Sequence, residues 1–171
     1  MPLSMYQASV PVFAQILGAV AGVLDKAQAH ATARKIDPAV LFSARLAPDM
    51  FPMSRQIQIA CDFAKGATAR LAGAEVPSWP DQEKTFADLQ ERIKKTVDFA
   101  QSFKPAQIDG SEERDVTVSV AGQPMTFKGR PYLVGFVMPN FYFHASVAYA
   151  ILRHNGVELG KMDYLGREPP A

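Results

Sequence analysis

Cysteine is nearly absent from this chain of 171 residues, in which Cys61 is the only one. A single cysteine excludes an internal disulfide and fits a reducing compartment. Cys61 falls on the predicted buried face of a helix, where a thiol is usually inert. We therefore expect a cytoplasmic protein whose thiol has no chemical role.

An excess of charge of either sign is also lacking. Eighteen basic and seventeen acidic residues give a net charge of +1, and no block of like charge stands out. The electrostatic footprint of nucleic-acid binding or of anionic membrane binding is therefore missing. We expect neither nucleic acid nor membrane as a partner, which leaves small molecules and proteins.

A targeting segment is not expected either. The apolar run from Val10 to Leu24 contains Gln15, and no Lys or Arg precedes Lys26. A signal peptide needs its positive charge ahead of the apolar stretch, and this run is too short to span a bilayer. We interpret it as a core helix of a soluble protein.

The common catalytic signatures are missing as well. The sequence has no G-x-G-x-x-G, no phosphate-binding loop, no G-x-S-x-G and no H-E-x-x-H. His144 and His154 would lie about 15 Å apart on one helix, so they cannot share a metal ion. The usual nucleotide, hydrolase and zinc-protease classes are therefore not indicated.

What the chain does have is helical periodicity. Apolar residues recur at steps of three and four, which predicts long helices packed in one domain covering residues 1–171. The expected long helices cover residues 5–33, 51–72, 81–103 and 132–155. Asp37-Pro38 predicts the start of a short helix that runs to about Leu46. Gly18 and Gly22 are expected to let a neighbouring helix approach closely.

The third long helix has the clearest pattern. Its apolar seam runs from Phe86 to Phe103, and Asp81 and Glu83 suit the positive end of its dipole. Five charged residues are expected to face solvent: Asp88, Glu91, Arg92, Lys94 and Lys95. The linker 74–80 before it contains two prolines and is long enough for a parallel crossover.

The hydrophobic period changes after Lys104. Residues 115–120 alternate with period two, Ala121-Gly122-Gln123 supplies a turn, and a second short strand ends at Lys128. This pattern predicts a β-hairpin inserted between the third and fourth long helices. A two-stranded hairpin is unstable alone, so it should lie against the helices.

The chain is organised around residues 132–156. A stripe through Leu133, Phe136, Asn140 and His144 predicts an inward face that two polar side chains interrupt. Pro139 should disturb the helix there because it has no N–H to donate. His144 is either a core histidine bonded to a neighbour or the centre of a pocket.

Three phrases carry a resemblance: FPMSRQIQIACDFAKGATARLAG, DQEKTFADLQERIKKT and MPNFYFHASVAYAILRHNGVELGKMDYLG. They resemble an uncharacterised bacterial family allied to the DinB/YfiT-like superfamily, over nearly the whole chain. The resemblance implies an all-α fold, a DinB/YfiT-like four-helix bundle whose middle helices can run parallel. It also implies frequent homodimers.

Members of that superfamily hold a divalent metal with three histidines, and some use it to activate a thiol cosubstrate. In this chain His144 matches one of them, Asn140 stands in place of the second and Gln56 in place of the third. Amide oxygens are poor ligands for zinc or nickel. We therefore expect no resident metal, with a degenerate zinc or nickel site at these residues as the alternative.

Two classes of function stay open. The first is a DinB-like enzyme acting on a small molecule in a pocket of Gln56, Asn140, Tyr142 and His144, with His144 and Tyr142 as catalytic candidates. The second is a non-catalytic bundle that binds a ligand or forms a homodimer. In that case Gln56, Asn140 and His144 would form a buried polar network.

Overall fold

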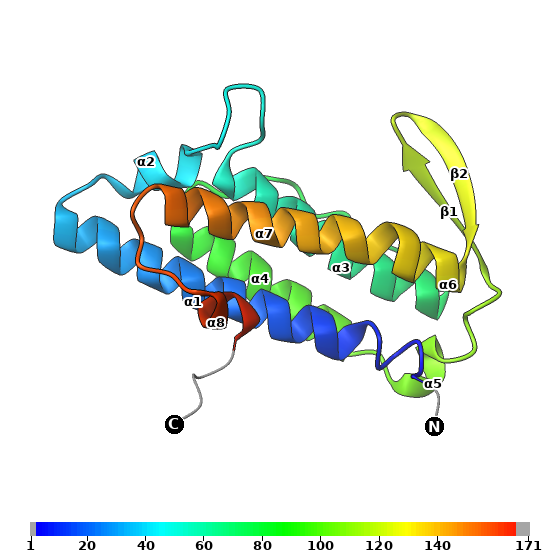
Figure 1. The fold of residues 1–171 in the computed structure, drawn as a ribbon. Coiled ribbons are helices and arrows are strands. Elements are labelled where there is room, and N and C mark those ends of the chain that lie inside the picture. The colour runs from blue at the N-terminus through cyan, green and yellow to red at the C-terminus, as the bar shows by residue number, and fades with distance from the viewer. Residues whose placement is uncertain (1–2, 167–171) are drawn as a thin grey trace.

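The computed structural model describes residues 3–166, which are mostly helical and include one small antiparallel sheet. The long helices lie side by side in Figure 1. They are α1 (Val10–Arg34), α3 (Met53–Ala72), α4 (Phe86–Gln101) and α7 (Met138–His154). The short elements are α2 (Pro38–Ser43), α5 (Pro105–Ile108), β1 (Asp115–Val120), β2 (Gln123–Lys128), α6 (Gly129–Pro131), the wide helical turn η1 (Tyr132–Val137) and α8 (Lys161–Leu165).

Two long helices begin later than the sequence predicts. Helix α1 begins at Val10 rather than near residue 5, with Pro11 in its first turn, where the missing N–H has no helical partner to lose. Helix α4 begins at Phe86 rather than at residue 81, because Thr85 and Asp88 form a capping box. The Thr85 hydroxyl accepts from the Asp88 amide at 3.1 Å, and the Asp88 carboxylate accepts from the Thr85 amide at 2.9 Å.

The predicted signals around α2 and α3 are confirmed in part. Asp37 caps α2 by accepting a hydrogen bond from the Ala39 amide at 2.9 Å, but the helix ends at Ser43 rather than near Leu46. Helix α3 ends at Gly73, whose φ of +70° is the left-handed cap that glycine adopts without strain.

The segment before α7 differs from the predicted helix, and this difference changes which residues face inward. Residues Tyr132–Val137 form a π-helical turn, and the Met138 amide bonds to the Leu133 carbonyl, one residue further back than in an α-helix. This wider turn precedes Pro139, which has no N–H for the α-helical pattern. The buried stripe therefore passes through Leu133, Val137, Phe141, Ala145 and Ala148.

Helices α3 and α4 run in the same direction in Figure 1, and α1 and α7 run opposite to them. The side-chain contacts agree, because early residues of α3 contact the start of α4 and the chain just before it. Gln58 donates to Glu83 at 2.8 Å, and Arg92 contacts Asp62 at 3.0 Å. The chain between Ala72 and Phe86 is therefore the crossover that the proline-rich linker permits.

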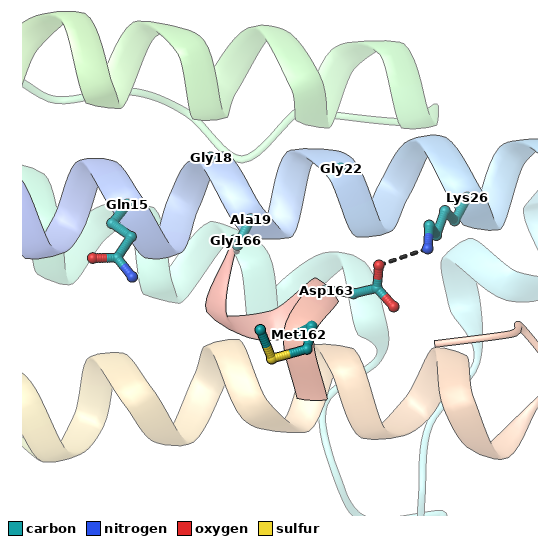
Figure 2. Close-up of a pocket in the computed structure, with 8 residues that line it drawn as sticks. All are labelled: Gln15, Gly18, Ala19, Gly22, Lys26, Met162, Asp163 and Gly166. Atoms are coloured by element: carbon teal, nitrogen blue, oxygen red, sulfur yellow. Dashed lines mark hydrogen bonds and ion pairs between the residues drawn. The ribbon is translucent and has the colours of Figure 1, made fainter. Parts of the chain in front are cut away.

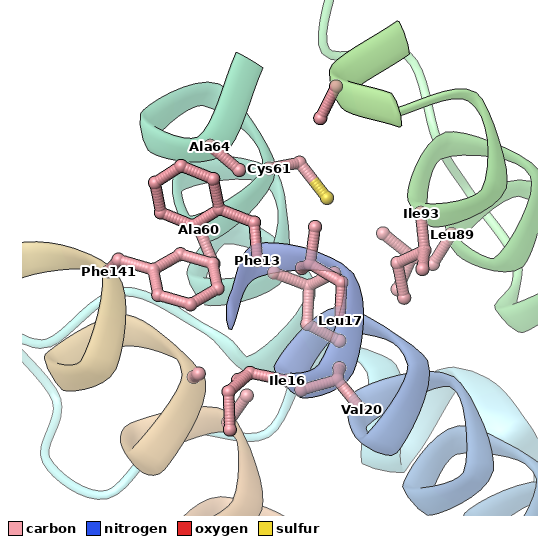
Figure 3. Close-up of a cluster of buried hydrophobic side chains, with 14 of the residues drawn as sticks. Phe13, Ile16, Leu17, Val20, Ala60, Cys61, Ala64, Leu89, Ile93 and Phe141 are labelled. Carbon is pink, nitrogen blue, oxygen red and sulfur yellow. The ribbon is translucent and has the colours of Figure 1, made fainter. Parts of the chain in front are cut away.

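The core lies where these four helices meet. Figure 3 shows Phe13 and Leu17 of α1 among residues of α3, α4 and α7. The Phe13 ring meets the Phe141 ring edge to face, with centroids 5.0 Å apart. The residues predicted on the inner face of α3 are buried as expected: Ile57, Ala60, Cys61, Ala64, Ala67 and Leu71.

The predicted hairpin is confirmed. Strands β1 and β2 pair antiparallel with Val116 opposite Phe127, and Ala121 and Gly122 both take positive φ in the two-residue turn. Val116 and Val118 are buried, and the Phe127 ring stacks on Phe136 with centroids 5.3 Å apart. The hairpin therefore packs on the π-helical turn.

The prediction for Gly18 and Gly22 was wrong. A side chain at either position would meet no atom within 4 Å, so neither glycine is needed for close helix packing. Both line a shallow groove of about 450 Å³ between α1 and α8, which Figure 2 shows together with the Lys26 to Asp163 ion pair. The closest packing at this end of α8 is instead at Ala19, which faces Gly166, the residue after α8.

Helix α1 is the one helix of the described chain that is long and apolar enough to cross a membrane. Half of its most apolar window is buried inside the protein. Core helices pass the same test, so this feature is weak evidence for a membrane span.

Candidate functional site

The site predicted around His144 is built by α3 and α7, which pack along their lengths. Gln56 lies in the first turn of α3, and its Oε1 atom is 2.7 Å from Nδ1 of His144 on α7. Gln56 is 2% exposed, whereas His144 is only partly buried. The pair therefore has a buried amide and an imidazole that reaches toward the surface.

Gln56 determines which imidazole nitrogen carries the proton. Its Nε2 group donates to the Phe51 carbonyl at 3.1 Å, so its oxygen is the atom that faces His144. An amide oxygen only accepts, and Nδ1 of a neutral imidazole must then carry the hydrogen. The Nε2 lone pair of His144 is consequently left to accept a proton or a hydrogen bond from another group.

Electrostatics favour the neutral ring. Burial lowers the pKa of His144 below its ordinary value, and the positive charge of Arg55 lowers that pKa further. Phe63 stacks on the imidazole with centroids 6.0 Å apart, and Phe143 meets it edge-on at 5.1 Å. The arrangement holds an oriented, neutral imidazole between aromatic rings.

The other predicted site residues do not join this pair. The Asn140 side chain donates to the Phe136 carbonyl at 2.7 Å, one turn earlier on the same helix. Tyr142 contacts Phe141, and its pKa is raised first by burial and then by Tyr164 of α8. It lies on the α8 side of α7, whereas His144 faces α3.

The donor set does not fit a three-ligand metal centre. His144 offers one imidazole nitrogen, and Gln56 is bonded to the opposite nitrogen of the same ring. Between residues 3 and 166, no three His, Cys, Asp or Glu side chains are grouped so as to hold a metal ion. We therefore derive no chemical step through a metal at this position.

Arg92 contradicts the expectation of a solvent-facing side chain. Its side chain is only 2% exposed and contacts Asp62, Asp81 and Glu83 at 2.9 to 3.0 Å. Two of these carboxylates come from the crossover segment, which the same network holds against α3 and α4. The local sequence pattern did not indicate this, because two of the partner carboxylates come from the crossover segment.

A second polar arrangement that the sequence reading missed lies under the hairpin. The Arg70 guanidinium on α3 donates to the hydroxyl of the buried Tyr132 at 3.2 Å. Both residues line a cavity of about 260 Å³, together with Asp62, Phe63, Val118, Ser119 and Phe136. No sequence motif marks it, since α3, β1 and η1 each contribute residues.

Comparison with known proteins identifies the family of this chain. No curated protein matches it. A crystal structure of a DinB family member protein from Shewanella denitrificans is 39% identical in sequence, superposes with a TM-score of 0.87, and the match covers 97% of this chain and 94% of that one. Residues 5–165 match the family described as "Domain of unknown function (DUF1993)". The chain therefore belongs to the DUF1993 family, which is allied to the DinB-like fold, as the resemblance in its sequence indicated.

Proposed function

We propose that this protein binds a small molecule at the partly exposed seam between α3 and α7, where Nε2 of His144 accepts a proton or hydrogen bond from it. The observation that best supports this proposal is the orientation of the Gln56 amide. Its hydrogen bond to the Phe51 carbonyl turns its oxygen toward Nδ1 of His144, so Nδ1 carries the proton and Nε2 of His144 is unprotonated. A neutral base with a defined tautomer is what proton transfer at neutral pH requires. Phe51 and Phe143 flank the pair and are 55% and 53% exposed, so an apolar body would find contact surface there.

This proposal takes the DinB-like four-helix bundle as the scaffold and a cytoplasmic location as the setting. It assigns the oriented base to His144 alone. Neither Asn140 nor Tyr142 is given a role, since both side chains are directed elsewhere.

Ligand-observed NMR with phenol, benzyl alcohol and benzamide tests the proposal, because each probe joins a hydrogen-bond donor to an aromatic ring. We expect saturable binding to the wild type and loss of most of it in His144→Ala. His154→Ala is the matched control, since His154 is exposed at the end of α7. Equal binding to the wild type and both variants, or no binding to the wild type, would contradict the proposal.

Metal content is a separate check. We predict sub-stoichiometric zinc or nickel in protein purified without an affinity tag, because amides stand where two imidazoles would be required. A full equivalent of metal that is lost on His144→Ala would overturn this expectation.

A second candidate function is homodimer formation, favoured by exposed apolar side chains on η1 and α7. Val134 is 60% exposed and lies in the turn before α7, on the same helical segment as Phe143. Sedimentation equilibrium should show a dimer that dissociates in Phe143→Asp but persists in Val40→Asp, which alters an exposed residue on α2. A wild-type monomer across micromolar concentrations would remove this candidate.

A further inference from the structure

The cavity under the hairpin contains a cation without an acidic partner. Arg70 lines it, and no carboxylate of residues 3–166 lies within ion-pair distance of the guanidinium. Arg55 of α3 and Arg92 of α4, in contrast, form ion pairs with Asp81 and with Asp62, Asp81 and Glu83 respectively. An arginine presents its N–H groups as a planar fork that matches a carboxylate.

Tyr132 adds a second donor. Its hydroxyl oxygen accepts from Arg70 at 3.2 Å, so the hydroxyl keeps its own hydrogen to donate. The residue is 1% exposed, and no acceptor on the described residues lies within hydrogen-bond distance of that oxygen. A buried donor of this kind calls for an acceptor in the cavity.

Most of the remaining lining residues are apolar or aromatic. Phe63 and Phe136 meet edge to face with centroids 5.8 Å apart, and Tyr132 stacks on Phe136 at 6.0 Å. Val118 and Ser119 of β1 close the side that faces the hairpin. A volume of about 260 Å³ suits a ligand smaller than a typical drug molecule.

One carboxylate also lines the cavity, and its charge is compensated. Asp62 contacts Lys65 at 2.9 Å and Arg92 at 3.0 Å. It precedes Arg70 by two helical turns, about 12 Å along α3. An anionic group at Arg70 would therefore lie at the opposite end of the cavity from Asp62.

Gly66 is the residue that lets Arg70 take this position. A methyl group at residue 66 would lie 2.5 Å from Nη1 of Arg70, so the guanidinium rests directly over the glycine. Glycine in a helix interior is less favourable for the helix than alanine. Substituting alanine here should displace the guanidinium while leaving the fold intact.

We propose that this cavity binds a small carboxylate with an apolar or aromatic body, whose carboxylate receives hydrogen bonds from Arg70 and Tyr132 while its body packs between Phe63, Phe136 and Val118. The proposal does not depend on the His144 site, with which it shares only the Phe63 ring. Nothing in the sequence pattern marks this cavity as a site.

Phenylacetate and its neutral isostere phenylacetamide are the probes, with binding measured by calorimetry and by amide NMR shifts. We expect phenylacetate to bind the wild type at millimolar concentration and to shift the amides of Phe63, Val118 and Ser119. Phenylacetamide should bind at least about tenfold more weakly, since hydrogen bonds to a charged group are stronger than those to a neutral one.

Three variants and a control complete the test. Arg70→Gln and Tyr132→Phe should each weaken phenylacetate binding, the first by about tenfold or more. Gly66→Ala should weaken binding while keeping or raising the melting temperature, which separates loss of the site from loss of the fold. Arg153→Gln removes an exposed arginine on α7 and should bind like the wild type. No phenylacetate binding to the wild type, equal binding of both probes, or unchanged binding in Arg70→Gln and Gly66→Ala would overturn the proposal.

Discussion

At the scale of single residues, Arg92 is the most consequential side chain outside the candidate sites. Its buried guanidinium contacts one largely buried carboxylate, Glu83, and the more exposed Asp62 and Asp81, and its own Nε atom has no hydrogen-bond partner among residues 3–166. Removing Arg92 leaves Glu83 without an ion-pair partner, whereas Asp62 keeps Lys65 and Asp81 keeps Arg55. Its role is to fix the crossover segment on α3 and α4.

Arg92→Ala should therefore destabilise the protein by about 1.5 to 3 kcal/mol, because the largely buried Glu83 loses a charged hydrogen-bond donor. Lys94→Ala is the matched control on the same helix. Lys94 is 77% exposed, and its ion pair with Asp98 should be worth less than about 0.5 kcal/mol. Denaturant unfolding measures both, and similar losses in the two variants would refute this role for Arg92.

Glu83 gives the network a pH signature. Burial raises the pKa of Glu83, but hydrogen bonds from Arg92, its own backbone and Gln58 outweigh that effect and hold the pKa below its ordinary value. A lowered folded-state pKa contributes stability above the unfolded-state pKa, and this stability is lost as the pH falls through the folded-state pKa. Acidification should thus cost the wild type more unfolding free energy than it costs Arg92→Ala. Parallel pH profiles of the two proteins would contradict the assignment.

Cys61 gives a third prediction at this scale. It is fully buried, and burial raises the pKa of its thiol to about 12. The thiolate is the reactive form, so Cys61 should resist iodoacetamide in the native protein and react once the protein is unfolded. Mass spectrometry of labelled samples measures this, and rapid native labelling would show that the core opens around α3.

At the scale of elements, the π-helical turn Tyr132–Val137 determines which residues of α7 face inward. It moves the buried stripe to Phe141 and Ala145, and it leaves Asn140 and His144 on the flank that borders α3. Without that shift His144 would belong to the core. The wide turn therefore places the candidate base at the surface.

A pair of neighbouring phenylalanines tests this register. Phe141 is 0% exposed and packs on Phe13, whereas Phe143 is 53% exposed. Phe141→Ala should cost about 3 to 5 kcal/mol, and Phe143→Ala less than about 1 kcal/mol. Urea unfolding distinguishes them, and the opposite ranking would contradict the register in which Phe141 faces the core.

The helices and strands show how much of the fold could be predicted from the sequence. Period, caps and turn residues predicted the helices, the hairpin and the buried face of α3, because those signals are local. The register of α7 could not be predicted, since it depends on how the chain accommodates Pro139 within a packed helix. Arg92 was misplaced for a related reason: its burial depends on carboxylates of the crossover segment, whose path the local pattern does not specify.

The candidate site could also be predicted only in part from the sequence. Gln56 and His144 are brought together across 88 residues of sequence, as the resemblance implied, while Asn140 and Tyr142 point elsewhere. The Arg70 and Tyr132 cavity carried no sequence signal, because its residues come from three separate elements. Sites of that kind become visible only when the fold is known.

At the scale of the whole molecule, the crossover between α3 and α4 leaves α3 packed along α7. That packing puts a buried amide beside a partly exposed imidazole, and the amide is itself held by the chain entering α3. The central claim is that the fold holds His144 neutral, with its proton on Nδ1 and its Nε2 lone pair available.

Nitrogen-15 NMR of the imidazole of His144 across a pH titration tests this claim most directly. We predict the Nδ1–H tautomer and a pKa below the ordinary value of histidine, because Gln56 accepts from Nδ1 while burial and Arg55 disfavour the charged ring. Gln56→Leu removes the acceptor and should redistribute the proton toward Nε2. A wild-type His144 that carries its proton on Nε2, or that titrates above the ordinary histidine pKa, would contradict the account.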